Sequence, residues 1–116
     1  MKELNLPHLP PIRFAKYIIS KDETSALVRV EFDSIPSLAM LVEAAAQSSA
    51  AFSDSTKKMG FLVTLKNVKL LQKTETKEYD IRVTFQHQLD ALTYFGFEAN
   101  DSDRLIASGV FVIAMQ

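Results

Sequence analysis

One carboxylate stands alone inside a long apolar stretch, and its position makes it the first candidate for chemistry in this chain. Glu43 is the only charged residue between Pro36 and Ser53. A carboxylate is costly to bury without a partner, and one held in such a place is suited to act as a general base or acid. If Glu43 instead reaches solvent at a groove between subunits, or pairs with a Lys or Arg, it needs no catalytic role. The sequence leaves both interpretations open.

Two further polar side chains could take part in the same chemistry. Gln47 follows Glu43 by one helical turn, so the two side chains share a helix face. Gln47 could orient the carbonyl group of a ligand, although such a Gln more often bonds a backbone group of the surrounding sheet. His87 falls on the apolar face of its predicted strand and could carry a proton, but a structural histidine is the simpler interpretation.

Several other kinds of site are disfavoured by what the sequence lacks. It has no cysteine, which removes disulfides, thiolate catalysis and cysteine metal sites. The two histidines, His8 and His87, are too few and too scattered for a metal site. No serine stands in a Gly-x-Ser-x-Gly elbow, and the three glycines are isolated, so they form no phosphate loop. We therefore expect neither a metal nor a cofactor.

The composition is that of one globular domain. We expect a single domain over residues 1–116, with 47% apolar residues to supply its core. A formal net charge of −1 creates no field that would attract nucleic acid or an anionic membrane, so neither is expected as a partner. The first residues, MKELNLPHLPP, lack the apolar run of a signal peptide, so we expect a cytoplasmic protein.

The residues around Glu43 predict a long central helix. Residues 34–53 are mostly Leu, Met, Val and Ala; Pro36 suits the first turn, and Ser34 or Ser37 suits the N-cap. A helix that is apolar on nearly all sides is a buried helix. At roughly 18 residues and roughly 27 Å, it is too short and too rich in alanine to span a membrane.

Six segments have the patterns of β-strands. Alternating apolar and polar residues indicate half-buried antiparallel strands, and an almost wholly apolar run indicates a central strand covered on both faces. In the segment that follows the helix, the phase slips near Lys66 and Asn67, which predicts a bend or bulge. The segments are residues 13–20, 25–32, 60–72, 79–89, 92–99 and 104–115, of which the last is the expected central strand.

The order of two strands, one helix and four strands predicts an α+β fold with segregated elements. Because one helix has to cover a large sheet, we expect the sheet to curl and the helix to lie across its concave face. The strand over residues 60–72 would then form an unprotected edge. Pairing of this edge with a second copy would protect it, which predicts a homodimer with a continuous sheet.

This pattern resembles the hot-dog fold, and particular residues narrow the resemblance to one family. The segment MLVEAAAQ, residues 40–47, resembles the central-helix motif of the 3-hydroxyacyl-acyl-carrier-protein dehydratases. In that motif a catalytic carboxylate is followed by a run of small residues and a Gln. The segment LPH, residues 6–8, resembles the family's lead-in to its first strand, while residues 60–70 and 95–115 resemble its later strands.

The resemblance assigns roles to four residues. Glu43 matches the catalytic carboxylate, and Gln47 matches the Gln of the motif. Thr64 corresponds to the Gly whose backbone N–H helps to polarise the thioester carbonyl, and Met40 is the first residue of the helix motif. The resemblance therefore implies that Glu43 is catalytic and that Gln47, Thr64 and Met40 bind the substrate.

The chain departs from this family where the second catalytic group belongs. The dehydratases carry Gly-His-Phe-Pro-Gly in the loop before the helix, whereas this chain has only FDSIPS at residues 32–37. A Pro-Gly-Asp turn between later strands is replaced by KTETKE at residues 73–78. His8 matches a family position that is not catalytic. The resemblance thus implies a retained fold with the dehydratase chemistry broken.

The function that fits best is binding of an acyl thioester, with acyl-CoA or an acyl carrier protein as the partner, in a tunnel between the helix and the second subunit. Whether the protein is also an enzyme stays open. Thioester hydrolysis fits better than dehydration, because it needs one carboxylate to activate water and donors for the oxyanion.

A non-catalytic module of the same fold, which binds a lipid or serves as an assembly partner, is the alternative. An internal cavity beside Glu43 and Gln47 would favour thioester binding, and a helix packed solidly against the sheet would favour the module.

Overall fold

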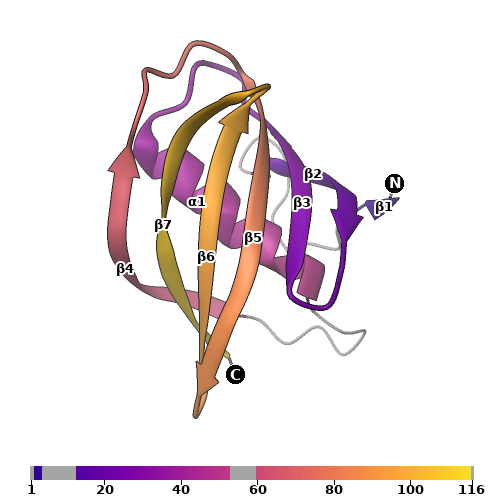
Figure 1. Cartoon of the computed structure of the whole chain (residues 1–116), viewed down its shortest axis with the longest axis vertical. Coiled ribbons are helices and arrows are strands. Elements are labelled where there is room, and N and C mark those ends of the chain that lie inside the picture. The colour runs from indigo at the N-terminus through magenta and orange to yellow at the C-terminus, as the bar shows by residue number, and fades with distance from the viewer. Residues whose placement is uncertain (1, 4–12, 53–59, 116) are drawn as a thin grey trace.

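The computed structural model describes residues 2–3, 13–52 and 60–115, which form one sheet and one helical segment (Figure 1). The helix α1 (Leu38–Ser48) is followed directly by the 3-10 helix η1 (Ser49–Phe52). The segment LPH at residues 6–8, with His8, lies outside the described residues. The strands are β1 (Lys2–Glu3), β2 (Ala15–Lys21), β3 (Ser25–Glu31), β4 (Gly60–Leu70), β5 (Glu78–Leu89), β6 (Leu92–Asp101) and β7 (Arg104–Met115).

The seven strands form an antiparallel sheet in the order β1-β2-β3-β5-β6-β7-β4. Figure 1 shows the sheet curving around α1, which lies on its concave side. The predicted α+β arrangement, with one helix across a curled sheet, is therefore confirmed. The edge place of β4 is confirmed as well. The strand β7 lies next to this edge with a neighbour on each side, but Ser108 and Val110 are only half-buried, so the expectation that it is covered on both faces is wrong.

The helix is shorter than the sequence predicted. The α-helix has 11 residues instead of roughly 18, and it begins at Leu38 because Ser37 is its N-cap, accepting a hydrogen bond from the Met40 N–H at 3.2 Å. At the other end, the Ser48 hydroxyl donates to the Ala44 carbonyl at 2.7 Å and the Ser49 hydroxyl to the Ala46 carbonyl at 2.6 Å. Such bonds from Ser to the preceding turn compete with regular helix, and the chain tightens into η1.

The side of α1 that faces the sheet carries the helix's part of the hydrophobic core. Its side chains meet β-branched and aromatic residues that alternate along the strands, as expected for strands with one face in the core. Residues of this core that are fully shielded from solvent include Leu41, Ala44, Ala45, Val28, Val30, Ile81, Val83 and Phe111.

The predicted bulge in β4 is present. The pairing of β4 with β7 shifts register between Lys66 and Lys69, and Asn67 adopts a positive φ of 53°. The bulge turns Val68 inward over Gly109, where a Cβ would come within 2.8 Å of the Val68 side chain. Gly109 is therefore needed for the close approach of these two strands.

A second bulge, in β5, corrects the prediction for His87. The register with β6 shifts between Phe85 and His87, so the alternation that places Phe85 against the core does not continue. His87 is exposed and stacks on Tyr94 with a ring separation of 4.2 Å. Tyr94 precedes the buried Phe95, so both rings lie on the sheet face opposite α1, which we call the outer face. The expectation that His87 shares the apolar face is wrong.

Candidate functional site

Glu43 lies on the side of α1 that faces away from the sheet. It is half-buried, and so are Ala46 and Ala50, while Ala39 is exposed. The four residues follow one another at helical spacing and form a single stripe, which we call the outer stripe of α1. Along this stripe the described neighbours of Glu43 are alanines with small side chains.

Gln47 is buried, with 4% of its surface exposed, and it joins the helix to the start of β2. Its Oε1 accepts hydrogen bonds from the backbone N–H groups of Phe14 at 2.8 Å and Ala15 at 3.1 Å. With Oε1 held by two donors, Nε2 faces the Glu43 carboxylate and donates to Oε1 of that residue at 3.5 Å. Gln47 therefore bonds the backbone of the surrounding sheet, which is the alternative that the sequence left open, and it also positions Glu43.

The four residues singled out from the sequence are only partly brought together. Met40, Glu43 and Gln47 lie on successive turns of α1, and Met40 is half-buried against the core. Thr64 lies on the edge strand β4, where it pairs with Val112 and is exposed. Its neighbour Leu65 pairs with the core residue Phe111, so the Thr64 side chain points to the outer face, away from Glu43. The substrate-binding roles of Met40, Gln47 and Thr64 stay predictions.

Groups that could hold a metal or carry a perturbed charge lie elsewhere or are lacking. Within the described ranges, no cluster of three or more His, Cys, Asp or Glu side chains could bind a metal ion. Burial raises the pKa of the Tyr79 phenol, and the hydrogen bond from Arg29 to Asp80 raises the pKa of Arg29. Both residues stand on the β3–β5 side of the sheet, not on the outer stripe of α1.

The edge strand β4 exposes apolar side chains in the single chain. Leu62, Val63 and Leu65 are 40%, 51% and 46% exposed, and Leu70 and Leu71 follow them at the end of the strand. In the described sheet, β4 has a neighbour on one side only, β7, so its second edge carries backbone groups open to a further strand.

Among the described residues, no helix is long and apolar enough to cross a membrane.

No family model and no curated protein matches the sequence. Solved structures do match. The dehydratase heterocomplex ApeI:P from Xenorhabdus doucetiae aligns with a TM-score of 0.78 at 16% identity, over 96% of this chain and 88% of that chain. A variant of the HP0420 homologue from Helicobacter felis aligns with a TM-score of 0.74 at 22% identity, over 98% of both chains.

A third match is a hypothetical thioesterase protein with coenzyme A from Streptococcus pneumoniae, with a TM-score of 0.67 at 14% identity, over 85% of this chain and 84% of that chain. These neighbours are hot-dog proteins. The chain has the hot-dog fold. The resemblance drawn from the helix motif is therefore confirmed for the fold. At sequence identities this low, the roles of individual residues do not transfer from these neighbours.

Within the hot-dog fold, some features of this chain could be found only in the structure. The sequence places Gln47 near Glu43 but not against the backbone N–H groups of Phe14 and Ala15, because no local pattern pairs residues so far apart. The hollow on the outer face of the sheet, lined by residues of β4 to β7, was also missed. Its charged residues had the alternation of an exposed face, and their grouping depends on the strand order.

Proposed function

We propose that this hot-dog protein binds acyl thioesters, as acyl-CoA or acyl carrier protein, along the outer stripe of α1. The observation that carries the proposal is the arrangement of Glu43 and Gln47. A buried amide anchored by two backbone N–H groups is aimed at a half-buried carboxylate in an otherwise apolar helix. Pre-organised polar groups in an apolar setting are the usual composition of a ligand site.

The acyl chain would lie between α1 and a second subunit. The side of α1 that faces the sheet carries core residues, among them Leu41, Ala44 and Ala45, which are fully buried. The outer stripe, by contrast, carries small side chains around Glu43. An acyl chain packed on Ala39, Ala46 and Ala50 would bring its thioester to the carboxylate without displacing any core residue.

A second copy paired on β4 would complete such a groove. Strand pairing there would satisfy the open backbone groups of β4 and cover Leu62, Val63 and Leu65. The product is a homodimer with a continuous sheet, in which one α1 lies beside the other. The thioesterase neighbour, whose structure contains coenzyme A, is consistent with a ligand of this class.

Thioester hydrolysis is the reaction that this arrangement favours. Glu43 would activate a water molecule as general base, and backbone or helix-end N–H groups would stabilise the oxyanion. Dehydration of a 3-hydroxyacyl group needs a second acid or base opposite Glu43. His87 stands on the outer face of the sheet, so it does not supply that group.

A non-catalytic assembly partner is the second candidate. The full burial of Leu41, Ala44 and Ala45 on the sheet side of α1 favours it, and so does the dehydratase neighbour, which is a heterocomplex. In this case β4 would pair with an edge strand of a related chain.

A panel of acyl-CoA and 3-hydroxyacyl thioesters separates these candidates. We expect the protein to bind acyl-CoA, with any turnover appearing as free thiol, and to yield no enoyl product by mass spectrometry. Enoyl product from the isolated protein would show that another residue performs the second step. A protein that binds no member of the panel would leave the assembly module as the function.

A further inference from the structure

The start of β2 is irregular at the place where it anchors Gln47. The backbone N–H groups of Phe14 and Ala15 both donate to the same Gln47 oxygen, at 2.8 and 3.1 Å. In an extended strand, successive N–H groups point to opposite sides of the backbone, so this pair departs from strand geometry. The pairing of β2 with β3 also shifts register between Ala15 and Tyr17. Hydrogen bonds of the sheet alone therefore do not fix the direction of the two donors.

Phe14 is held from its other side by one backbone bond and by one aromatic ring. Its carbonyl accepts a hydrogen bond from the Glu31 N–H at 3.0 Å. Its ring packs on the ring of Phe32, with the ring centroids 4.8 Å apart. Phe32 is buried in the core, whereas Phe14 is half-buried. A shift of the Phe32 ring is therefore expected to move Phe14 and the N–H groups beside it.

A third ring supports Phe32 from β5. The Tyr79 ring meets the Phe32 ring edge to face, with centroids 6.0 Å apart, and Tyr79 is fully shielded from solvent. The Phe32 N–H donates to the Lys77 carbonyl at 2.8 Å, and the Tyr79 hydroxyl accepts from the Thr76 N–H at 3.4 Å. The rings of Phe14, Phe32 and Tyr79, which we call the ring row, thus end on the β4–β5 connection.

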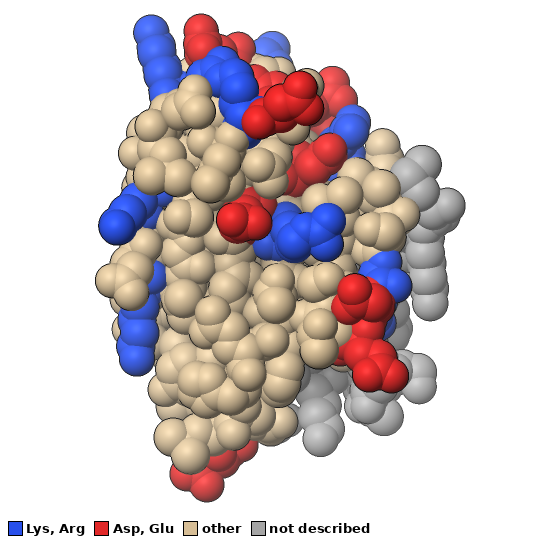
Figure 2. All heavy atoms as spheres, viewed as in Figure 1, with Lys and Arg blue, Asp and Glu red and all other residues tan. Residues whose placement is uncertain are grey.

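The β4–β5 connection, residues 71–77, is itself fixed on the sheet. The Leu71 N–H donates to the Ile106 carbonyl at 2.7 Å, and Arg104 forms an ion pair with Glu75 at 2.9 Å. Figure 2 shows charged side chains of both signs gathered at the end of the molecule where Figure 1 places this connection. The ring row therefore runs from a fixed, solvated end of the sheet to the anchor of Gln47.

We propose that Phe32 and Tyr79 are positioning residues for the proposed thioester site. Through Phe14 they fix the two N–H groups that anchor Gln47, and so the direction from which Gln47 meets Glu43. Aromatic pairs prefer offset and edge-to-face arrangements, so a row of rings holds direction better than aliphatic side chains of similar volume. The inference rests on the proposed function in one respect, namely that Glu43 is the group that meets the ligand.

Hydrogen exchange of single amides, measured by NMR without any ligand, tests the ring row. A core substitution that only lowers global stability accelerates all globally protected amides by a common factor. In Phe32→Leu and in Tyr79→Leu, the amides of Phe14 and Ala15 should exchange faster than this factor explains, and the side-chain amide signals of Gln47 should shift. Tyr79→Phe keeps the ring and should leave both amides as they are in the parent.

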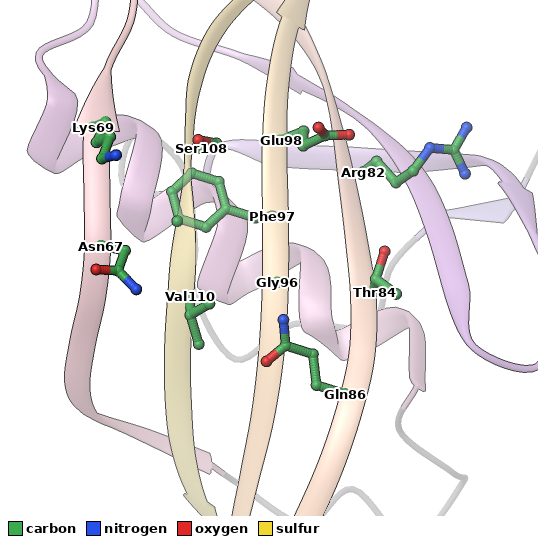
Figure 3. A pocket seen from close by; sticks show the side chains of 11 residues that line it. Asn67, Lys69, Arg82, Thr84, Gln86, Gly96, Phe97, Glu98, Ser108 and Val110 are labelled. Atoms are coloured by element: carbon green, nitrogen blue, oxygen red, sulfur yellow. The ribbon is translucent and has the colours of Figure 1, made fainter.

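Phe97→Leu is the matched control. Phe97 is 3% exposed and Phe32 is 6% exposed, so the same substitution removes equally shielded atoms. Phe97 lies on β6, three strands from β2 in the sheet, where it borders the hollow on the outer face (Figure 3). Its replacement should accelerate all core amides alike, with no additional effect on Phe14 and Ala15.

Binding of acyl-CoA is the second measurement. At equal folded fractions, affinity should fall in Phe32→Leu and Tyr79→Leu and stay at the parental value in Phe97→Leu and Tyr79→Phe. If a leucine variant fails to fold by circular dichroism, Phe14→Leu, at the half-buried end of the ring row, gives the same test on the Ala15 amide.

Two results would overturn the inference. One is that the amides of Phe14 and Ala15 follow the common factor in Phe32→Leu. The other is that Phe97→Leu weakens binding as much as Phe32→Leu does. A parent protein that binds no acyl-CoA would remove the proposed function, and the exchange rates would still decide whether the ring row holds the anchor of Gln47.

Discussion

The Gln47 side chain links Glu43 to the start of β2: its oxygen accepts from the backbone N–H groups of Phe14 and Ala15, and its nitrogen donates to the Glu43 carboxylate at 3.5 Å. The bond to Glu43 is long, so it contributes little energy. Its value lies in orientation, because an amide fixed at one end cannot turn away from the carboxylate at the other.

Removing this amide should destabilise the fold. In Gln47→Leu, the N–H groups of Phe14 and Ala15 lose their acceptor, and each buried unsatisfied donor costs about 1–3 kcal/mol. We expect a decrease of about 2–5 kcal/mol in the free energy of unfolding, measured by urea denaturation. Gln88→Leu, at an exposed position of β5, should change stability by less than about 0.5 kcal/mol. A Gln47→Leu protein as stable as the parent would contradict the anchoring role.

Neutralising Glu43 should affect ligands without unfolding the protein. Glu43→Gln keeps the shape and an acceptor oxygen for Gln47, while the charge and the base are lost. We expect stability equal to or above that of the parent, since a partly desolvated charge is gone. Binding of acyl-CoA should weaken, and any hydrolysis should cease, in assays of both proteins on the same panel.

Two comparisons sharpen this prediction. Glu23→Gln makes the same change in an exposed turn and should alter neither property. If Glu43→Gln instead lowers stability by about 3–5 kcal/mol, as when a buried ion pair is broken, and binding stays intact, Glu43 is a structural residue.

The protein should be at least a dimer at micromolar concentration, with β4 in the interface. Val63→Lys places a charge on the exposed edge of β4, where residue 63 is 51% exposed, and should reduce the molar mass measured by light scattering. Leu89→Lys, at the end of the β5–β6 hairpin, alters a residue of similar exposure and should leave the β4 contact unchanged. A monomeric parent protein would remove the shared groove from the proposed function.

Asp22 should make the β2–β3 turn sensitive to acid. Its carboxylate accepts from the backbone N–H groups of Thr24 at 2.9 Å and Ser25 at 2.8 Å, and these bonds hold the pKa of Asp22 below its ordinary value of 3.8. A carboxylate whose pKa is depressed in the folded state stabilises the fold above the unfolded-state pKa, and this contribution is lost as the pH falls through the folded-state pKa.

We therefore expect Asp22→Ala to have a lower Tm than the parent at neutral pH. The difference should stay constant down to the ordinary pKa of the carboxyl and then shrink as the pH falls further. Thermal melts of both proteins over a series of acidic buffers measure it. A difference that widens in acid would show that the turn hydrogen bonds do not carry the effect.

Much of the architecture could be predicted because its signals are local. Alternation located the half-buried strands, the phase slip at Lys66 and Asn67 located a bulge, and Ser37 was one of two expected N-caps. The end of the helix was missed, because the hydroxyls of Ser48 and Ser49 bond to the preceding turn. His87 was misplaced because one extra residue in β5 reverses every side chain that follows, and alternation alone does not reveal an insertion.

The site was less predictable for a different reason. The proximity of Glu43 and Gln47 could be predicted because Gln47 follows Glu43 by four positions, about one helical turn. The anchor of Gln47 on Phe14 and Ala15 joins segments that only the folded chain brings together. Thr64 was chosen by resemblance, and its side chain direction depends on the register of β4 with β7.

The position of β4 in the sheet also has a consequence for how the chain folds as it is synthesised. Its neighbour β7 follows only after β5 and β6, so β4 leaves the ribosome long before the strand that pairs with it. During that interval Leu62, Val63 and Leu65 stand on an unpaired strand, and late pairing of distant segments is slow. The strand proposed to join two finished subunits is thus also a strand whose apolar side chains wait for their partner during synthesis.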